Sequence, residues 1–222
     1  MNTTKALSLA TCGLLTGIAS GSPFQSIGAD LVNVGDQGYT YRLYVNLDAG
    51  ARIDAVYGNA TGSLIIAPGE GNSFYQDPTG GNTSQAINSA FFQFVPALEW
   101  DSYVSIGALY QNGDPFGSNE LNEIGIDWTS FEAGLSLETD NGSWFVTPDD
   151  PQGQEVDGRV FIAQLTLEEG PWTPTISEIG FGLQGKDADG NTWNYYAGIV
   201  PAPGMLGMLG LVAITGSRRR RD

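Results

Sequence analysis

Residues 38–47 read GYTYRLYVNL, and side chains of two kinds alternate along the whole stretch. One face carries the large apolar residues Tyr39, Tyr41, Leu43, Val45 and Leu47. The opposite face carries Thr40, Arg42, Tyr44 and Asn46. Because side chains in a strand point alternately to opposite sides of the sheet, this period of two predicts a half-buried β-strand.

A second stretch repeats the pattern at residues 158–167, GRVFIAQLTL. The residues expected on its buried face are Phe161, Ala163, Leu165 and Leu167. Val160 and Ile162 on the other face indicate that this face is partly covered as well. The sequence therefore predicts a strand inside a layered β-structure.

Shorter strands are expected along the rest of residues 22–199: Ile53–Tyr57, Leu64–Ile66, Phe91–Val95, Tyr103–Ile106, Ile124–Trp128, Ser143–Val146, Ser177–Leu183 and Thr192–Ile199. Turn sequences separate them, among them Asn112-Gly113, Asp157-Gly158 and Asp189-Gly190-Asn191. A long loop is expected at Gln76–Ala90, with a helical turn at Ser84–Asn88. About ten short strands without an amphipathic helix predict one all-β domain, an antiparallel β-sandwich or jelly roll.

The charge of the chain is unevenly distributed. The 222 residues carry a net charge of −16, and four of the nine basic residues are Arg218–Arg221. Between Ser22 and Pro203 the net charge is −20. Such a surface repels phosphates, so nucleic acid is excluded as a partner. The acidity is explained by solubility in a salty medium, or alternatively by divalent-cation binding.

The N-terminus has the order of a secretory signal peptide. Lys5 precedes an apolar run of 13 residues, Ala6–Ile18, which is followed by the small residues ASGS. Cleavage is expected after Ala19 or Gly21, so residues 1–21 are assigned to the signal. Cys12, the one cysteine of the chain, lies inside this segment, and the mature protein is expected to have no disulfide.

The C-terminus, residues 200–222, reads VPAPGMLGMLGLVAITGSRRRRD. Pro201 and Pro203 favour an extended, accessible segment. The apolar stretch Gly204–Gly216 makes a helix of about 20 Å, shorter than the roughly 30 Å hydrocarbon core of a bilayer. The arginine block is expected to hold the far end on the cytoplasmic side of the membrane. A simple membrane anchor is the alternative interpretation of this tail.

In this order of parts the tail resembles the PEP-CTERM sorting signal of Gram-negative bacteria. The matching residues are Val200, Pro201, Ala202, Pro203 and Gly204, the apolar stretch, and Arg218, Arg219, Arg220 and Arg221. Ala202 stands where the family pattern has glutamate. The resemblance implies that an exosortase-type sorting protease cuts near the prolines after a transient stay in the inner membrane. The body would then reach the cell surface or the extracellular matrix.

Two stretches of the body are similar to exported proteins of marine planctomycete-type bacteria. They are FYQDPTGGNTSQAINSAFFQFVPALEWDSYVSIGA (residues 74–108) and WFVTPDDPQGQEVDGRVFIAQLTL (residues 144–167). The strand DGRVFIAQLTL also resembles one in cohesin-type scaffolding sandwiches. These similarities imply an exported location and a sandwich fold, and no particular chemistry.

The composition excludes several kinds of catalysis. The chain has no histidine and, after processing, no cysteine, which removes Ser-His-Asp and Cys-His catalysis and histidine-ligated metal sites. Carboxylate chemistry remains, but a glycosidase needs two carboxylates facing each other across a sugar. The sequence therefore favours a non-enzymatic protein, with a carboxylate-based glycosidase as the remaining alternative.

Two acidic segments are candidates for calcium. In KDADGNTW, residues 186–193, the alternating ligand types are Asp187, Asp189 and Asn191. Thr192 and Gly198 stand where an EF-hand loop counted from Asp187 has Gly and Glu, so a hairpin turn is the expected structure. In TPDDPQGQEVDG, residues 147–158, the candidates are Asp149, Asp150 and Asp157. A looser calcium site stays open at both segments; no other cofactor is expected.

The five tryptophans allow a carbohydrate-binding interpretation, since sugars stack on exposed indole faces, although core packing is the expected role for most of them. Trp172, flanked by prolines, is the candidate ligand-binding residue. The sequence thus predicts an exported surface or matrix protein of unknown molecular activity. The alternative is an adhesive module that binds carbohydrate, such as extracellular polysaccharide, or calcium.

Overall fold

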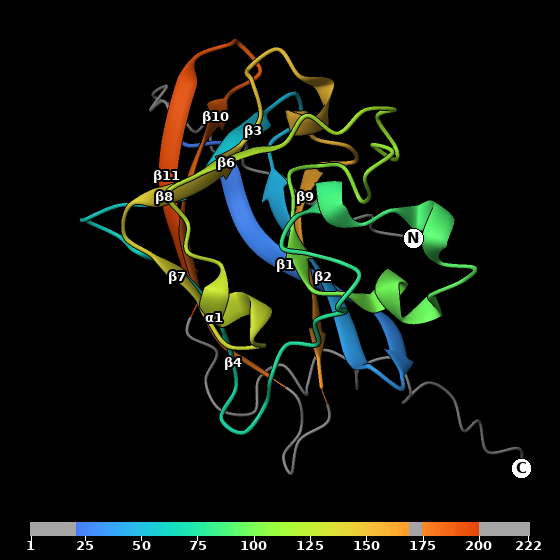
Figure 1. Ribbon diagram of the computed structural model, residues 1–222. Helices are drawn as coiled ribbons and strands as arrows, with labels where there is room; N and C mark the ends of the chain where they lie inside the picture. Colours follow the sequence, from blue (N-terminus) through green and yellow to red (C-terminus); the bar gives the residue numbers. More distant parts are fainter. Residues whose placement is uncertain (1–20, 169–174, 200–222) are drawn as a thin grey trace, which may run out of the picture.

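The computed structural model describes residues 21–168 and 175–199 (Figure 1). The predicted signal peptide up to Ser20, the tail from Val200 onward and Trp172 lie outside the described residues. Two antiparallel sheets make up the fold, which confirms the predicted β-sandwich.

The first sheet has the order β1-β2-β9-β5. Its strands are β1 (Phe24–Gly35), β2 (Gly38–Leu47), β9 (Arg159–Leu167) and the short β5 (Tyr103–Val104). The two stretches with the clearest alternation, β2 and β9, are neighbours, with Tyr41 opposite Leu165 and Leu43 opposite Ala163. The centre of the sheet is therefore built from the segments that the sequence pattern identified most clearly.

The second sheet has the order β6-β8-β3-β10-β4-β7, and β11 pairs with β10. Its strands are β3 (Arg52–Gly58), β4 (Leu64–Pro68), β6 (Asn122–Ile124), β7 (Leu137–Thr139), β8 (Gly142–Phe145), β10 (Ile176–Lys186) and β11 (Thr192–Ile199). Strand β10 pairs with β4 through its first half and with β3 through its second half. This arrangement leaves β11 along the edge of the sheet, where it forms a long hairpin with β10 (Figure 1).

The main hydrophobic core lies between the two sheets. Leu43 and Val45 of β2 and Leu165 of β9 meet Val56 of β3 and Phe181 of β10, and all five are fully buried. Burial of a side chain of this size stabilises the fold by about 1.5–3 kcal/mol. This core explains how the domain stays folded without a disulfide.

A smaller cluster covers the outer face of the first sheet. Ile87, Leu98, Tyr103 and Phe161 pack together there, under the long connection between β4 and β5. This connection contains the 3₁₀ turns Ser84–Ala86, Ser89–Phe91 and Pro96–Trp100; the remaining helical elements are α1 (Thr129–Glu132) and the turn Pro151–Gly153. The loop predicted at Gln76–Ala90, with a helical turn near Ser84, is confirmed.

Phe161 differs from its predicted position. It was expected on the same face as Ala163 and Leu165, but it belongs to the outer cluster. The reason is a bulge in the β2–β9 pairing, where Leu43 lies opposite Ala163 and Tyr44 lies opposite Phe161. The extra residue on β9 turns the side chains before it to the other face.

Two predicted strands are wrong. Residues 91–95 continue in helical turns, with the Val95 N–H donating to the Phe91 carbonyl, and Phe94 is 73% exposed. The strand predicted over Ile124–Trp128 ends at Ile124, because Gly125 adopts a φ of +71° and turns the chain. Strands β1 and β7 were not predicted.

None of the helices in the described parts of the chain is long and apolar enough to cross a membrane.

Candidate functional site

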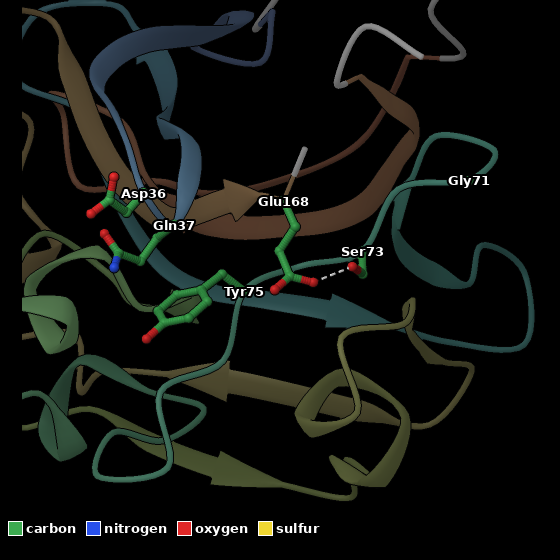
Figure 2. Close-up of a pocket in the computed structure, with 6 residues that line it drawn as sticks. All are labelled: Asp36, Gln37, Gly71, Ser73, Tyr75 and Glu168. Carbon is green, nitrogen blue, oxygen red and sulfur yellow. Dashed lines mark hydrogen bonds between the residues drawn. The ribbon is translucent and has the colours of Figure 1, made fainter. Parts of the chain in front are cut away.

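A hollow with a volume of about 370 Å³ opens at one end of the first sheet. Figure 2 shows the residues that line it: Asp36, Gln37, Gly71, Ser73, Tyr75 and Glu168. Most of the lining is polar, with one aromatic ring. We refer to this group of six residues as the Tyr75 hollow.

The hollow forms where three chain segments meet at the end of β9. On one side of β9, Tyr39 of β2 lies opposite Leu167, which brings the turn between β1 and β2 next to Glu168. On the other side, residues 73–75 run antiparallel to β9. The Glu168 N–H donates to the Ser73 carbonyl at 3.0 Å, and the Tyr75 N–H donates to the Thr166 carbonyl at 2.7 Å.

Strand alternation decides which side chains face the hollow. Phe74 is buried in the core between Ser73 and Tyr75, so these two neighbours point to the opposite side, into the hollow. Figure 2 shows the Tyr75 ring below Gln37 and Glu168, and Ser73 beside Glu168.

Gly38 allows the turn to come this close to β9. Its φ is +115°, and a Cβ atom at this position would overlap the carbonyl oxygen of Leu167. Only glycine fits both the backbone conformation and the close approach. The Asp36-Gln37 turn therefore depends on this residue for its place at the rim.

A hydrogen-bonded network behind the hollow holds Tyr75. The Tyr75 hydroxyl donates to Oδ2 of Asp77 at 3.1 Å, while Oδ1 of Asp77 accepts from the Thr79 N–H at 2.8 Å. Burial, the hydrogen bond to Asp77 and the neighbouring carboxylates raise the pKa of Tyr75 to about 12. The phenol therefore stays protonated and keeps its hydrogen bond at neutral pH.

Asp101 organises the loop that carries Asp77. It is fully buried, and its carboxylate accepts hydrogen bonds from the backbone N–H groups of Asp77 (2.8 Å), Gly81 (3.1 Å) and Ser102 (2.9 Å). Burial raises the pKa of Asp101 to about 7, and the three donors act against this increase. The three hydrogen bonds that Asp101 accepts position the loop.

The two carboxylates of the hollow have no cationic partner. Across residues 21–168 and 175–199 the ion pairs are Arg52–Asp54 and Arg159–Asp30. Glu168 is oriented by a hydrogen bond from the Ser73 hydroxyl, and Asp36 is exposed on the turn. The negative charge of both groups is thus available to a ligand.

A second hollow of about 190 Å³ lies against the outer face of the first sheet, beside Tyr44 and Phe161. The Arg159 guanidinium covers the Tyr44 ring at 4.0 Å from its centre and forms an ion pair with Asp30 at 2.7 Å. Both the ring face and the charge are already engaged within the protein. This hollow is therefore the weaker binding candidate.

The calcium candidates in residues 186–193 form the turn between β10 and β11. Oδ1 of Asp187 accepts from the backbone N–H groups of Asp189 (3.0 Å) and Asn191 (2.8 Å), and the Asn191 amide donates to both carboxylate oxygens. These hydrogen bonds lower the pKa of Asp187, the one from the Asn191 side chain most of all. The hairpin interpretation is confirmed, and the Asp187 oxygens serve the turn.

The second acidic segment spreads its candidates apart. Asp150 caps the 3₁₀ turn Pro151–Gly153 by accepting from the Gln152 N–H, while Asp149 is exposed. Asp157 and Gly158 form a tight turn between the bridged residues Val156 and Arg159, with φ of 54° at Asp157. Within residues 21–168 and 175–199, no group of three acidic, histidine or cysteine side chains is arranged to hold a metal.

Three tryptophans of the described ranges, Trp128, Trp144 and Trp193, pack against the protein. Trp144 is fully buried and its indole N–H donates to the Ser105 carbonyl at 2.9 Å; Trp193 is 8% exposed, and Trp128 packs on the main core. The expected core role is confirmed for Trp144 and Trp193. Trp172, the candidate for ligand binding, lies outside the described residues.

The Tyr75 hollow was not predicted from the sequence. Its residues come from positions 36 to 168 and meet only through the pairing of β2, β9 and residues 73–75. One local signal was present, since Gly35-Asp36-Gln37-Gly38 has the composition of a tight hairpin turn. Comparison with protein-family models, with curated proteins and with solved structures finds no match.

Proposed function

We propose that this protein is an exported, non-enzymatic β-sandwich that its C-terminal tail delivers to the cell surface or extracellular matrix. The observation that carries the proposal is where the fold begins and ends. Strand β1 starts at Phe24, after the proposed signal peptide, and β11 ends at Ile199, directly before Val200. All the described strands therefore lie between the two address segments in the sequence, so cleavage at both ends would leave every one of these strands on the mature chain.

The first and last strands also meet at one corner of the sandwich. The rings of Phe24 and Tyr195 stack with centres 4.4 Å apart and an angle of 19° between their planes. The Tyr196 hydroxyl donates to the Ser63 carbonyl at 2.7 Å and fastens β11 to the sheet. Such contacts would keep β11 in place when an exosortase-type protease cuts near Pro201, a few residues beyond its end.

Localisation of tail variants in the host tests this proposal. We expect wild-type protein at the surface or in the medium, without its C-terminal arginines. A variant with Arg218–Arg221 replaced by glutamine, or with Pro201→Ala and Pro203→Ala, should stay in the membrane fraction at its uncut mass. Arg159→Gln, which removes a cation from the body, is the matched control and should travel like the wild type. Unchanged processing of both tail variants would refute the proposal.

A second proposal concerns what the exported domain does. The Tyr75 hollow favours saccharide binding, because an aromatic ring surrounded by carboxylate, amide and hydroxyl groups suits the apolar face and the hydroxyls of a sugar. Retention on immobilised polysaccharides tests this function. Wild-type protein should be retained without releasing reducing ends, and Tyr75→Ala should pass through. Equal retention of both proteins, or release of sugar, would contradict a non-enzymatic binding site here.

A further inference from the structure

The charge of the Tyr75 hollow points to a narrower class of ligand. We infer that it binds amino sugars, saccharides with a free protonated amine, in preference to neutral or N-acetylated sugars. This inference rests on the proposed saccharide binding and adds the chemical group that the site selects.

The lining of the hollow carries negative charge that no positive group among the described residues balances. Asp36 and Glu168 lie at the hollow with no cation opposite either of them in the described parts of the chain. A neutral sugar would leave both carboxylates without a charged partner. An ammonium group supplies that partner, and its hydrogen bonds to a carboxylate are about twice as strong as those between neutral groups.

The aromatic ring of Tyr75 lines the hollow together with Gln37 and Glu168 (Figure 2), and its hydroxyl is engaged by Asp77. A ligand in the hollow would therefore meet the ring, and a cation over a tyrosine ring is attracted by the ring electrons. The same ring packs against the C–H groups of a sugar, so one residue serves both parts of an amino sugar.

Other classes of ligand fit the hollow less well. A metal ion lacks ligands, because no three acidic side chains gather here or elsewhere in residues 21–168 and 175–199. Anions are repelled by Asp36 and Glu168 and by the net charge of −20 on the body. An apolar ligand does not match a predominantly polar lining. A hydroxyl-bearing cation would bring a charge partner for Asp36 and Glu168 and hydroxyls for the polar lining.

Titration calorimetry on the full-length protein tests the inference. The probes are an oligomer of glucosamine and the N-acetylglucosamine oligomer of the same length, compared at about pH 6, where a primary amine is protonated, and about 0.15 M salt. We expect the free amine to bind at least about tenfold more tightly, the difference that one charge-assisted hydrogen bond provides.

Charge-removing variants locate the effect. Asp36→Asn and Glu168→Gln should each weaken glucosamine-oligomer binding about tenfold and leave binding of the acetylated oligomer unchanged. Asp149→Asn removes the same charge from an exposed position elsewhere and should change neither. If Asp149→Asn weakens binding as much as Asp36→Asn, the amine is attracted by the general charge of the surface, and the inference is overturned.

The remaining outcomes separate this inference from the function on which it rests. Equal binding of the two oligomers, lost together in Tyr75→Ala, would retain saccharide binding and refute amine selection. Binding of neither oligomer would refute both. Binding of a simple diamine as tightly as the glucosamine oligomer would refute a role for the sugar and leave a site for cations alone.

Discussion

Replacing Asp101 by asparagine should remove part of the pH dependence of the protein's stability. The carboxyl group is fully buried, and its pKa rises from an ordinary 3.8 to about 7 in the fold. The folded state therefore favours the protonated form. The resulting stabilisation is fully present below about pH 4 and is lost as the pH rises toward about 7, because folding then requires burial of a charge.

The change in the free energy of unfolding follows from the pKa values of Asp101 in the unfolded and folded protein. The difference between a pKa of 3.8 and one of about 7 corresponds to about 4 kcal/mol. Between about pH 5 and about pH 8, linkage gives a loss of about 2.5 kcal/mol in the free energy of unfolding. An asparagine cannot titrate. The side-chain oxygen of asparagine can still accept hydrogen bonds from the N–H groups of Asp77 and Ser102. Its NH₂ group then faces the Gly81 N–H, and the loss of that hydrogen bond lowers the free energy of unfolding by about 1 kcal/mol at every pH.

Urea unfolding at several pH values, followed by tryptophan fluorescence, to which the buried Trp144 contributes, measures this difference. Asp101→Asn should be less stable than the wild type at about pH 5 and more stable at about pH 8. Repulsion among the other acidic groups is common to both proteins and cancels in the comparison. If the free energies of unfolding of the wild type and Asp101→Asn changed with pH in the same way across this range, titration of Asp101 would be refuted.

Three further predictions concern stability. Leu43→Ala should lower the free energy of unfolding by about 2–5 kcal/mol in urea titrations, because the side chain is fully buried between the sheets. Gly38→Ala should cost at least about 1–3 kcal/mol, measured in the same way, because a Cβ overlaps β9. Arg52→Gln, which leaves the buried Asp54 without its ion pair, should cost about 3–5 kcal/mol, whereas Arg159→Gln should cost less than about 1 kcal/mol, since that pair is exposed. Equal losses in the two arginine variants would contradict the last prediction.

The segments that were predicted correctly are those whose burial follows a local pattern. In β2 one face meets the core along most of the strand, so alternation of side chains is visible in the sequence. In β9 both faces are buried, and a nearly continuous run of apolar residues identifies the strand. The turn at Asp157-Gly158 was predicted for a similar reason, since both residues tolerate the left-handed conformation that they adopt. For these two strands and this turn, the residue types of one short segment were sufficient to predict the structure.

Strand β1 shows why other elements were missed. It lies at the edge of its sheet, and Leu31, Val32 and Val34 are all exposed, although they fall on both faces of the strand. In β1 only Phe24 and Ile27 pack against the main core, and both are only partly buried, so the periodic signal is weak. Phe91–Val95 is the opposite case, since its apolar residues suggested a strand where no neighbouring strand is available for pairing.

The candidate site was beyond sequence reasoning because its parts are distant along the chain. Asp36 and Glu168 are 132 residues apart, and only the register of β2 on β9 brings their segments together. Their side chains have no distinguishing context in a sequence with 25 acidic residues. By contrast, the tail residues from Val200 to Arg221 form a pattern within one short segment, which is why the sequence alone leads to a proposal for them.

Mass spectrometry of the mature protein isolated from its host tests whether the protein is exported with removal of both end segments. We expect an N-terminus at Ser20 or Ser22 and a C-terminus near the segment from Val200 to Gly204. Protein recovered from the surface or medium with Arg221-Asp222 still attached would contradict it.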